Sequence, residues 1–358
     1  MHRRILTALL GLAALAFAPG CLHRAESAAV AKVPSEREMA AYLFVYFKDD
    51  THDLHFALSS DGYTFTDVNG GKPVILGEDI AEQKGIRDPY IVRGPDNQFY
   101  MAMTDLHIFA QKAGYRDTEW QRDGRAYGWG NNRALVLMKS KDLLTWDSTR
   151  LRVDQAFPAL ADIGCAWAPS LIYDESAKRM LMTFTMRFGN QRNALYWSHL
   201  SPDFTRLETE PKRLFEAYPG DKTCIDSDLV RVGDKYRLFY VPHDGTPGIK
   251  QAVSDTLTSG YRYDPRWLDP EPRACEAPNV WKRIGEQKWV LMYDCYGISK
   301  HNFGFCETTD FETFKPLGHF NEGVMKTVNI ESPKHGAVIH LTAAEARRLA
   351  DHWKLPRY

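Results

Sequence analysis

The chain has 358 residues, 45 Lys and Arg against 46 Asp and Glu, and a formal net charge of −1. This balance argues against a nucleic-acid binder, which normally carries a basic footprint. With 44% hydrophobic and 25% charged residues, the composition is that of a globular protein and excludes a largely disordered chain. The length allows one large domain or two small ones.

The N-terminus has the pattern of an export signal. Two arginines precede an apolar run of fourteen residues, 5–18, which is too short to span a bilayer but suits a signal-peptide core. Gly20-Cys21 follows, so Cys21 is a candidate lipidated N-terminus, and ordinary cleavage before the polar stretch 25–35 is the competing interpretation. We expect a signal at 1–21, a linker at 22–40 and a catalytic domain at 41–358. The protein is then periplasmic or anchored to the cell envelope, with no membrane contact besides the lipid.

Two short patterns recur after the linker. The first is a strand opened by a polar or small residue beside Pro or Asp, at 87–93, 167–174, 225–232, 276–283 and 333–341. The second is a turn built on an acidic residue, at Asp61, Asp142, Asp203, Asp255 and Asp310. Further β-rich runs lie between them, at 98–105, 179–186, 235–241 and 288–294. Four-stranded units repeated about a centre form a β-propeller, so the chain predicts an all-β fold with five blades.

The ends of the repeat predict how the ring closes. The last leading strand has no outer strands after it, and the first Asp turn has no leading strand before it. We therefore expect the strands of 42–68 to pair outside the strand 336–341, which removes exposed edges. A short C-terminal helix follows over 341–353, with Thr342 as N-cap and Glu345 three residues on. The segment 106–133 is too long for a simple turn and is an insertion over one face.

The cysteines carry little signal. Five follow Cys21, and an odd number leaves at least one unpaired. None of their spacings gives a CxxC pair, so they do not indicate a structural zinc site. Buried small apolar residues are the favoured interpretation.

Three acids stand at the start of leading strands, which line the axis of a propeller. They are Asp88, Asp226 and Glu276, with Asp228 as the alternative to Asp226. Like charges this close cannot all ionise freely, so at least one pKa should rise. A protonated carboxyl beside a carboxylate suits hydrolysis of a glycosidic bond. A single Asp before Pro often only caps a turn, but three acids in equivalent positions of three repeats favour function.

The motifs IRDPYIV, WAP at 167–169, CIDSDLV and CEAPNV, in this order, resemble the signature of glycoside hydrolase family 43 over about residues 42–341. The resemblance implies a five-bladed propeller that inverts the anomeric configuration. It implies Asp88 as general base, Asp226 as the carboxylate that tunes and orients the acid, and Glu276 as general acid. Two departures are Arg-Asp-Pro for the commoner Ala-Asp-Pro, and Glu-Ala-Pro for Glu-Gly-Pro. Arg87 could thereby lower the pKa of the base or bind substrate.

The resemblance also implies that His335, in PKHG, lies on the axis as a candidate ligand near a bound calcium ion. A core His bonded to backbone is the equal alternative, and no cofactor is required. The other candidate contacts to an oligosaccharide or polysaccharide substrate are Trp167, Trp129, Arg87, Arg192 and His301. Trp167 offers an apolar face for a sugar ring, and packing between blades is its other interpretation. Trp120, Tyr127, Arg187 and Asn302 are weaker candidates.

The predicted function is an exo-acting inverting glycosidase on polysaccharide side chains. The leading prediction is an α-L-arabinofuranosidase. A β-xylosidase or a β-galactofuranosidase of the same fold is the alternative. A sugar-binding propeller without catalysis is a second hypothesis, although a lectin needs few buried acids. A phosphorolytic propeller is a third, but it would need clustered basic residues, and the sequence shows one Arg at most at the axis. Fructan-cleaving propeller enzymes rank lower, because their opening motif and second domain are missing.

Overall fold

The structure is a computed structural model that describes residues 32–215, 223–242, 248–272, 274–298 and 300–355. The predicted signal at 1–21, with its lipidation site Cys21, lies outside the described residues, as does most of the predicted linker. The first strand begins at Met39. None of the helices in the described part of the chain has the length and apolar character needed to cross a membrane.

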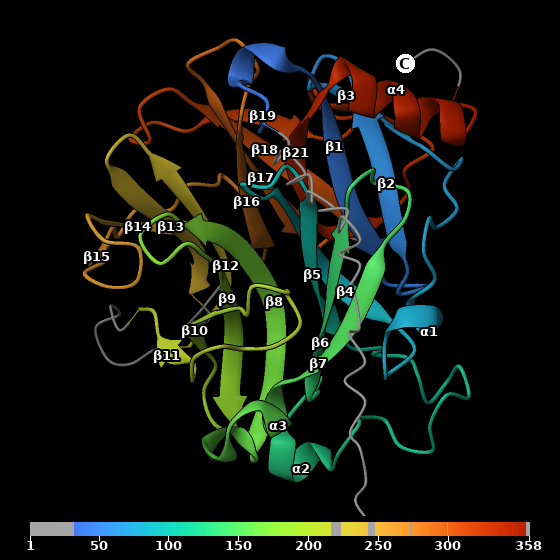
Figure 1. Cartoon of the computed structure of the whole chain (residues 1–358), viewed down its shortest axis with the longest axis vertical. Coiled ribbons are helices and arrows are strands. Elements are labelled where there is room, and N and C mark those ends of the chain that lie inside the picture. Colours follow the sequence, from blue (N-terminus) through green and yellow to red (C-terminus); the bar gives the residue numbers. More distant parts are fainter. Residues whose placement is uncertain (1–31, 216–222, 243–247, 273, 299, 356–358) are drawn as a thin grey trace, which may run out of the picture. The chain divides into compact units, whose positions relative to one another are not determined.

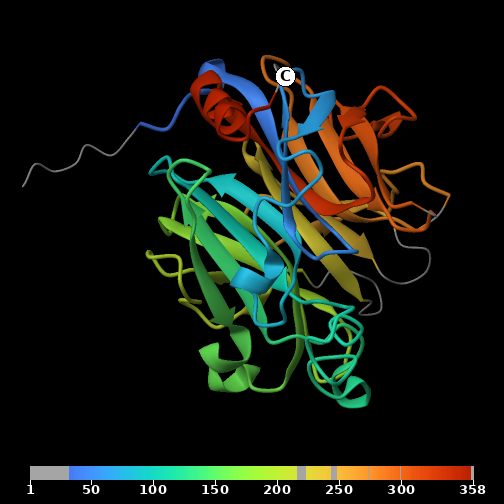
Figure 2. The same ribbon diagram turned by 90° about the vertical axis from the view of Figure 1, so that its right-hand side faces the viewer.

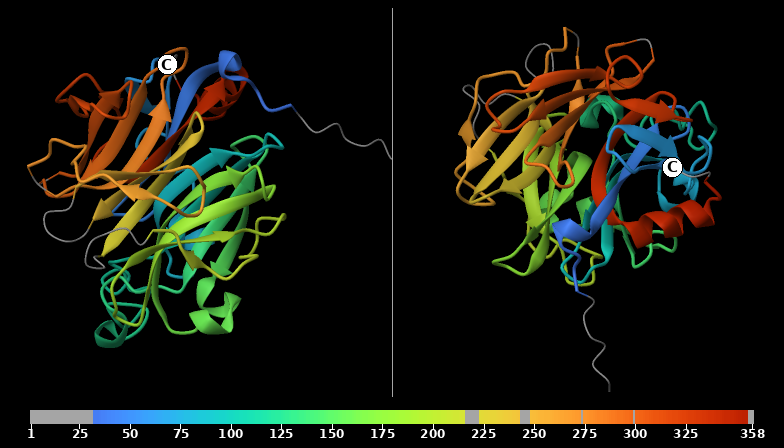
Figure 3. Two further views of the ribbon diagram at one scale, coloured as in Figure 1. Left: turned by 90° about the vertical axis from the view of Figure 1, so that its left-hand side faces the viewer. Right: turned by 90° about the horizontal axis from the view of Figure 1, so that it is seen from above.

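Five antiparallel sheets form the five predicted blades, which Figures 1 and 3 show arranged side by side. The innermost strands are β4 (Ile86–Arg93), β8 (Ile163–Asp174), β12 (Cys224–Val232), β16 (Glu276–Lys282) and β21 (Pro333–Thr342). The second strands are β5 (Phe99–Asp105), β9 (Arg179–Phe188), β13 (Lys235–Pro242), β17 (Trp289–Cys295) and β1 (Met39–Lys48). Contacts between inner strands run in the order β4, β8, β12, β16, β21 and back to β4, so the ring is closed.

The outer strands complete each sheet. The third strands are β6 (Ala134–Ser140), β10 (Ala194–His199), β14 (Lys250–Ser254), β18 (Asn302–Thr308) and β2 (Leu54–Ser59). The fourth strands are β7 (Asp147–Arg152), β11 (Lys212–Arg213), β15 (Arg262–Tyr263), β19 (Lys315–His319) and β3 (Thr64–Asp67), with β20 (Lys326–Val328) parallel to β3. Short helical turns are η1 (Glu36–Glu38), α1 (Gly77–Ile80), α2 (Gly124–Tyr127), α3 (Val153–Ala156) and η2 (Pro158–Leu160).

The predicted Asp turns lie between the third and fourth strands of all five blades. In the turn at Asp142, the carboxylate accepts backbone N–H groups at 2.9 and 2.8 Å, and the Ser140 hydroxyl accepts another at 2.8 Å. The same pattern repeats at Asp61 and Asp310. The residue after each of these acids has a positive φ, which the side-chain caps stabilise. At Asp255 the turn is built differently, with the Ser254 hydroxyl donating to the Ser259 carbonyl at the turn's other end.

Closure follows the prediction, because β1 pairs with β21 over Met39 to Lys48. Helix α4 (Ala343–His352) then contacts β1 and β21 (Figure 2), with a capping box between Thr342 and Glu345. The Glu345 carboxylate also accepts two hydrogen bonds from Arg93 of β4, at 2.7 and 2.8 Å. The helix therefore fastens the closing blade to the first blade.

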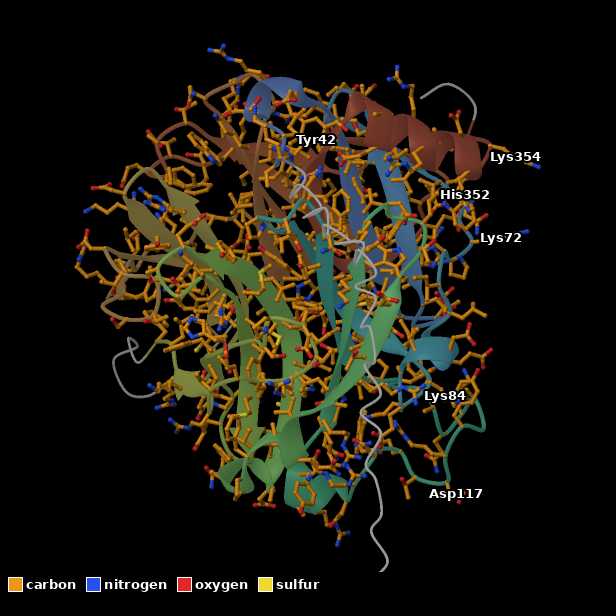
Figure 4. All side chains as sticks on the ribbon, in the orientation of Figure 1. Tyr42, Lys72, Lys84, Asp117, His352 and Lys354 are labelled. Carbon is orange, nitrogen blue, oxygen red and sulfur yellow. The ribbon has the colours of Figure 1, made fainter. Side chains whose placement is uncertain are left out.

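Side chains are dense throughout the ring of blades (Figure 4). The buried apolar ones form four clusters between neighbouring blades. One joins the closing blade to the first and second blades, and the others lie between the second and third, third and fourth, and fourth and closing blades. Each sheet thus packs on both faces. This is why a strand such as β1 is buried over seven consecutive residues instead of alternating.

Candidate active site

A β-bulge stands at the same place in each of the first four inner strands. The bulged residues are Asp88 (φ 54°), Ala168 (φ 44°), Asp226 (φ 52°) and Ala277 (φ 58°). In β21 the register shift falls at His335, between Lys334 and Gly336. A left-handed backbone at non-glycine residues is strained, and such strain gathers at functional sites. The bulges mark one ring of positions around the axis.

The residues just before the bulges form a second ring, and this ring lines a cavity of about 740 Å³. Its members are Arg87, Trp167, Ile225, Glu276 and Lys334. Glu276 therefore belongs one position earlier in the repeat than Asp88 and Asp226. The prediction that the three acids are equivalent was wrong, because the fourth blade puts Ala277 at its bulge. The shift places Glu276 on the cavity wall, and the two aspartates are buried.

Lys334 holds Glu276 in place. Its ammonium lies 3.2 Å from Glu276 Oε1 and 2.8 Å from Asp294 Oδ2. Burial opposes the charge on Lys334, but the two carboxylates outweigh it and raise the pKa of the ammonium above its usual range. Lys334 is therefore a permanent cation next to the carboxyl group of Glu276 on the cavity wall.

Asp88 is an ionised carboxylate. Its Oδ1 lies 3.2 Å from His335 Nδ1, and its Oδ2 accepts a 2.7 Å hydrogen bond from Thr104. Burial raises the pKa of Asp88, but the charge and hydrogen bond of His335 outweigh it. With help from Arg87 and Thr104, the pKa falls well below its usual value. The predicted effect of Arg87 on this pKa is thus present, in second place to His335.

Asp226 has the opposite electrostatic environment. Its pKa rises to about 7, because burial first, and then the nearby charges of Glu276 and Asp88, outweigh the opposing charge of His335. Its Oδ2 accepts a 3.2 Å hydrogen bond from the Ala277 N–H, and its own N–H donates to Thr185 Oγ1 at 3.1 Å. Asp226 therefore exchanges a proton near neutral pH while Asp88 stays charged.

Asp228, the alternative to Asp226, has a structural role. Its carboxylate accepts 2.6 Å hydrogen bonds from the Tyr90 hydroxyl and from the Val280 N–H, and it is fully buried. It ties the inner strands of the first, third and fourth blades together below the bulges. Its pKa rises to about 6, with burial as the main cause.

His335 supplies positive charge on the axis. Burial lowers its pKa, but Asp88 first and then Asp226 and Glu276 raise it to about 9. Calcium takes six to eight oxygen ligands, and a protonated imidazole is not a ligand. One oxygen of Asp88 is bonded to Thr104, so these residues fit a calcium ion poorly. The imidazolium itself balances the carboxylates, and calcium at His335 stays a prediction.

Arg87 anchors one side of the cavity. Its Nη1 donates to Asp49 Oδ1 at 2.6 Å, and Asp49 Oδ2 lies 3.7 Å from His301 Nδ1. All three side chains line the cavity. The structure thus brings the candidates Arg87 and His301 together through Asp49, a residue that the sequence analysis missed.

Two tryptophans, Trp129 and Trp167, line the cavity. Trp167 donates its indole N–H to the Gly130 carbonyl at 3.0 Å, and its ring lies 5.8 Å from that of Trp129, which is 56% exposed. Trp120 follows at 5.3 Å from Trp129. Trp129 and Trp120 come from the predicted insertion, which the structure places between β5 and β6 and which carries α2. Aromatic faces of this kind stack on sugar rings.

Arg187 positions these tryptophans. It donates to the carbonyls of Tyr127 and Trp129, at 2.9 and 2.6 Å, and its guanidinium lies 4.6 Å from the centre of the Trp167 ring. It is 5% exposed, so it is neither a free surface ion pair nor a simple contact for hydroxyl groups. Arg192 lines the cavity as predicted, whereas Asn302 lines a separate cavity.

Basic residues gather around the cavity. Arg87, Arg187, Arg192 and Lys334 all line it. At the starts of the described inner strands Arg87 is the one arginine, as predicted, since Arg187 lies in β9 and Arg192 in the loop after it. Lys334 and Asp294 were missed because a Lys before an axial His, and an Asp at the end of a second strand, carry no distinctive pattern. The PKHG motif could have pointed to Lys334. In the repeat, Lys334 occupies the same position as Arg87, directly before the register shift of its inner strand.

The arrangement brings together groups that can give and take protons. It combines an ionised aspartate, a second aspartate with a pKa of about 7, and a glutamate on the cavity wall. Two tryptophans line the same cavity.

The chain is similar to known proteins in sequence and in fold. A family model described as a probable glycosyl hydrolase domain, from a group related to glycoside hydrolase family 43, matches residues 37–347. A comparison with curated protein sequences gives no match.

Solved structures share the fold at low identity. A glycoside hydrolase family 43 protein from Bacillus licheniformis has a TM-score of 0.53 and 16% identity, over 83% of this chain and 55% of its own. A xylan β-1,4-xylosidase from Bacillus halodurans C-125 has a TM-score of 0.55 and 15% identity, over 81% and 54%. An α-L-arabinofuranosidase from Clostridium thermocellum has a TM-score of 0.51 and 14% identity, over 75% and 83%. The chain spans about half the length of the first two.

Proposed function

The chain belongs to a family of probable glycosyl hydrolase domains related to glycoside hydrolase family 43, and from this premise we propose that it is an inverting glycosidase acting on polysaccharide side chains. The leading substrate is an α-L-arabinofuranoside, with β-xylosides and β-galactofuranosides as alternatives. A xylosidase and an arabinofuranosidase are among the proteins that share the fold, which supports this range. The protein acts outside the cytoplasm, attached by a lipid at Cys21 or free in the periplasm.

The observation that carries the proposal is the contrast between two buried aspartates, Asp88 with a lowered pKa and Asp226 with a raised one, beside Glu276 on the cavity wall. Asp88 is ionised and takes a proton from the attacking water, whose oxygen bonds to the anomeric carbon. Glu276 gives its proton to the leaving oxygen as the glycosidic bond breaks, so one proton is taken and one is given in each cycle. Asp226, whose pKa is raised to about 7 by burial and by the charges of Glu276 and Asp88, tunes and orients this acid.

The positions of the other groups fit these roles. Glu276 lines the cavity and is held by Lys334, so it meets the leaving group directly. Trp167 and Trp129 offer faces for a sugar ring. The insertion covers one side of the cavity, which favours removal of terminal sugars over cleavage within a long chain.

The test compares Asp88→Asn and Glu276→Gln on aryl glycosides whose leaving groups differ in acidity. Glu276→Gln should lose at least a hundredfold on a poor leaving group and far less on an acidic phenol, which departs without a proton. Asp88→Asn should lose similar amounts on both. The exposed Glu175→Gln is the matched control and should keep wild-type rates.

The product anomer, followed by NMR, tests the single displacement. A retained configuration would contradict the inverting mechanism. If the wild-type protein cleaves no glycoside but binds glycans, it is instead a sugar-binding propeller.

Phosphorolysis is a second candidate function because four basic side chains line the cavity. Phosphate would then attack the anomeric carbon in place of water and yield a sugar phosphate. Against it, Arg87 is paired with Asp49, and Arg187 is bonded to backbone carbonyls. A sugar phosphate as the main product in phosphate buffer would replace hydrolysis with this alternative.

A further inference from the structure

A second group of reactive side chains lies in the fourth blade, outside the cavity described above. Its members are Glu271, Cys295 and His319, and one donor atom from each lies within 4.8 Å of the other two. Glu271 is in the loop before β16, Cys295 ends β17 and His319 ends β19. Among the described residues, no other three His, Cys, Asp or Glu side chains gather in this way.

The distances match a metal centre. Cys295 Sγ is 3.6 Å from His319 Nε2, and His319 Nε2 is 3.0 Å from Glu271 Oε1. With tetrahedral zinc bonds of about 2.0–2.3 Å, neighbouring ligand atoms stand roughly 3.4–3.6 Å apart. The two distances to His319 Nε2 lie close to this spacing, and the third, between Glu271 and Cys295, is within 4.8 Å.

Neighbouring side chains orient His319 and Glu271. His319 Nδ1 lies 3.1 Å from Glu322 Oε2, and metal-bound histidines commonly donate their other N–H to a carboxylate. The Tyr293 hydroxyl donates to Glu271 Oε1 at 2.9 Å. The Tyr293 ring passes directly over Gly304, where a Cβ would come within 2.2 Å of it. Glycine at this position thus permits the contact to Glu271.

Charge and access agree with a zinc ion. A carboxylate, a thiolate and a neutral imidazole balance Zn²⁺, and this mixture of O, S and N donors is typical of zinc. Cys295 is 2% exposed, whereas His319 and Glu322 also line a separate cavity of about 510 Å³. The cavity gives the ion a route in and leaves room for water as a fourth ligand.

We propose that Glu271, Cys295 and His319 bind one Zn²⁺ ion, with a water molecule completing the tetrahedron. Binding replaces the thiol proton of Cys295 and the proton shared by His319 and Glu271, and both go to solvent. The cysteine spacing could not show this site, because only one ligand is a cysteine and the three lie on separate segments. The proposal does not depend on the sugar chemistry.

The site also has a place in the architecture. Glu271 precedes Glu276 on the segment that leads into β16, and Cys295 directly follows Asp294, which holds Lys334. The ion would therefore fasten the strands that carry the wall of the main cavity.

The experiment uses the full chain, treated with a chelator and then titrated with Zn²⁺. We expect one zinc per chain by elemental analysis and a higher melting temperature with zinc. Co²⁺ in place of zinc should give the near-ultraviolet absorption of a thiolate–cobalt bond. Cys295→Ser should abolish this absorption and weaken Zn²⁺ binding by at least a hundredfold, and Glu322→Gln should weaken it by about tenfold.

Cys165→Ser, a buried cysteine of the second blade, is the matched control and should keep zinc binding and the cobalt absorption. If Cys295→Ser fails to fold, His319→Gln replaces it, since His319 is partly exposed. Zinc binding that is absent in the wild-type chain, or that is unchanged in these variants, would overturn the proposal.

Discussion

At the scale of single residues, the site depends on giving similar carboxyl groups different environments. Asp88 and Asp226 occupy equivalent bulges. Asp88 forms an ion pair with His335, whose Nδ1 lies 3.2 Å from Asp88 Oδ1. The Asp226 carboxylate accepts a single backbone N–H in its place. The ion pair with His335, helped by Arg87 and Thr104, therefore keeps Asp88 charged, while Asp226 titrates near neutral pH.

The pH dependence of catalysis should report this acid. In the proposed mechanism Asp226 must be protonated to support the general acid Glu276, and the pKa of Asp226 is about 7. We expect kcat/KM to fall about tenfold per pH unit above that value. In Asp226→Asn the residual activity should lose this alkaline limb or move it by more than one pH unit. An alkaline limb at the same pH in the variant would assign it to another group.

Stability should depend on pH through the same residue. The pKa of Asp226 is raised from 3.8 to about 7, so its contribution is fully present below pH 3.8 and is lost as pH rises through 7. Asp226→Asn has no such loss. The stability of the variant relative to the wild type should therefore rise between pH 4 and pH 7. At pH 8 the melting temperature of the variant should be on the order of a few degrees higher. Melting curves at pH 4, 6 and 8 check this, and equal differences at all three would contradict it.

At the scale of secondary-structure elements, the bulges explain one departure from the family motif. Ala277 has φ 58°, a left-handed conformation in which glycine is unstrained, and the commoner motif has Gly at this position. The strain of Ala there is about 1–2 kcal/mol. Glycine has greater conformational freedom in the unfolded chain. This freedom would cancel about 0.5–1 kcal/mol of the stability gained by relieving the strain.

Ala277→Gly should therefore stabilise the protein by about 0.5–1 kcal/mol. Ala277→Val, with a branched Cβ, should destabilise it by more than that amount. Urea unfolding of the two variants checks the prediction. A destabilised Ala277→Gly would mean that the Cβ packing of this buried residue outweighs the backbone strain.

The elements were predictable from sequence where the chemistry is local. Hydrophobic strands, turns built on Asp142 or Asp310, and the capping box of Thr342 and Glu345 all follow from neighbouring residues. The blade count and the closure of 42–68 on 336–341 followed from the repeat.

The arrangement within the site was less predictable because it depends on register. A one-residue bulge decides whether Glu276 or Ala277 faces the axis, and no local pattern records it. Lys334 and Asp294 meet only through pairing between blades. From the sequence alone, Arg187 resembles a surface residue. Its hydrogen bond to the Trp129 carbonyl depends on the insertion lying against it, which only the three-dimensional structure shows.

At the scale of the whole molecule, the ring brings together groups that are far apart in the chain. Asp88 and His335 are in contact because β21 closes against β4. Glu276 is held by a lysine from the same closing strand. The final inner strand therefore closes the fold and also supplies two positive charges that pair with the acids of the site, those of Lys334 and His335.

Two truncations separate these contributions. A chain that stops after Thr342 loses α4, with the Arg93–Glu345 ion pair and the buried Leu349, whose burial alone is worth about 1.5–3 kcal/mol. It keeps β21, so it should fold, melt at a lower temperature and retain its activity. A chain that stops after Ser332 loses β21, which leaves the backbone of β1 unpaired on one side.

The shorter chain also leaves Asp88 and Glu276 without His335 and Lys334, so two acids at the axis lose their counter-charges. It should show no cooperative thermal transition by circular dichroism and should elute from gel filtration as aggregate. If it instead unfolds cooperatively near the wild-type temperature, the ring does not depend on its closing strand. Adding the missing segment, 333–358, as a separate peptide should restore part of the transition, because the lost contacts are contacts between strands.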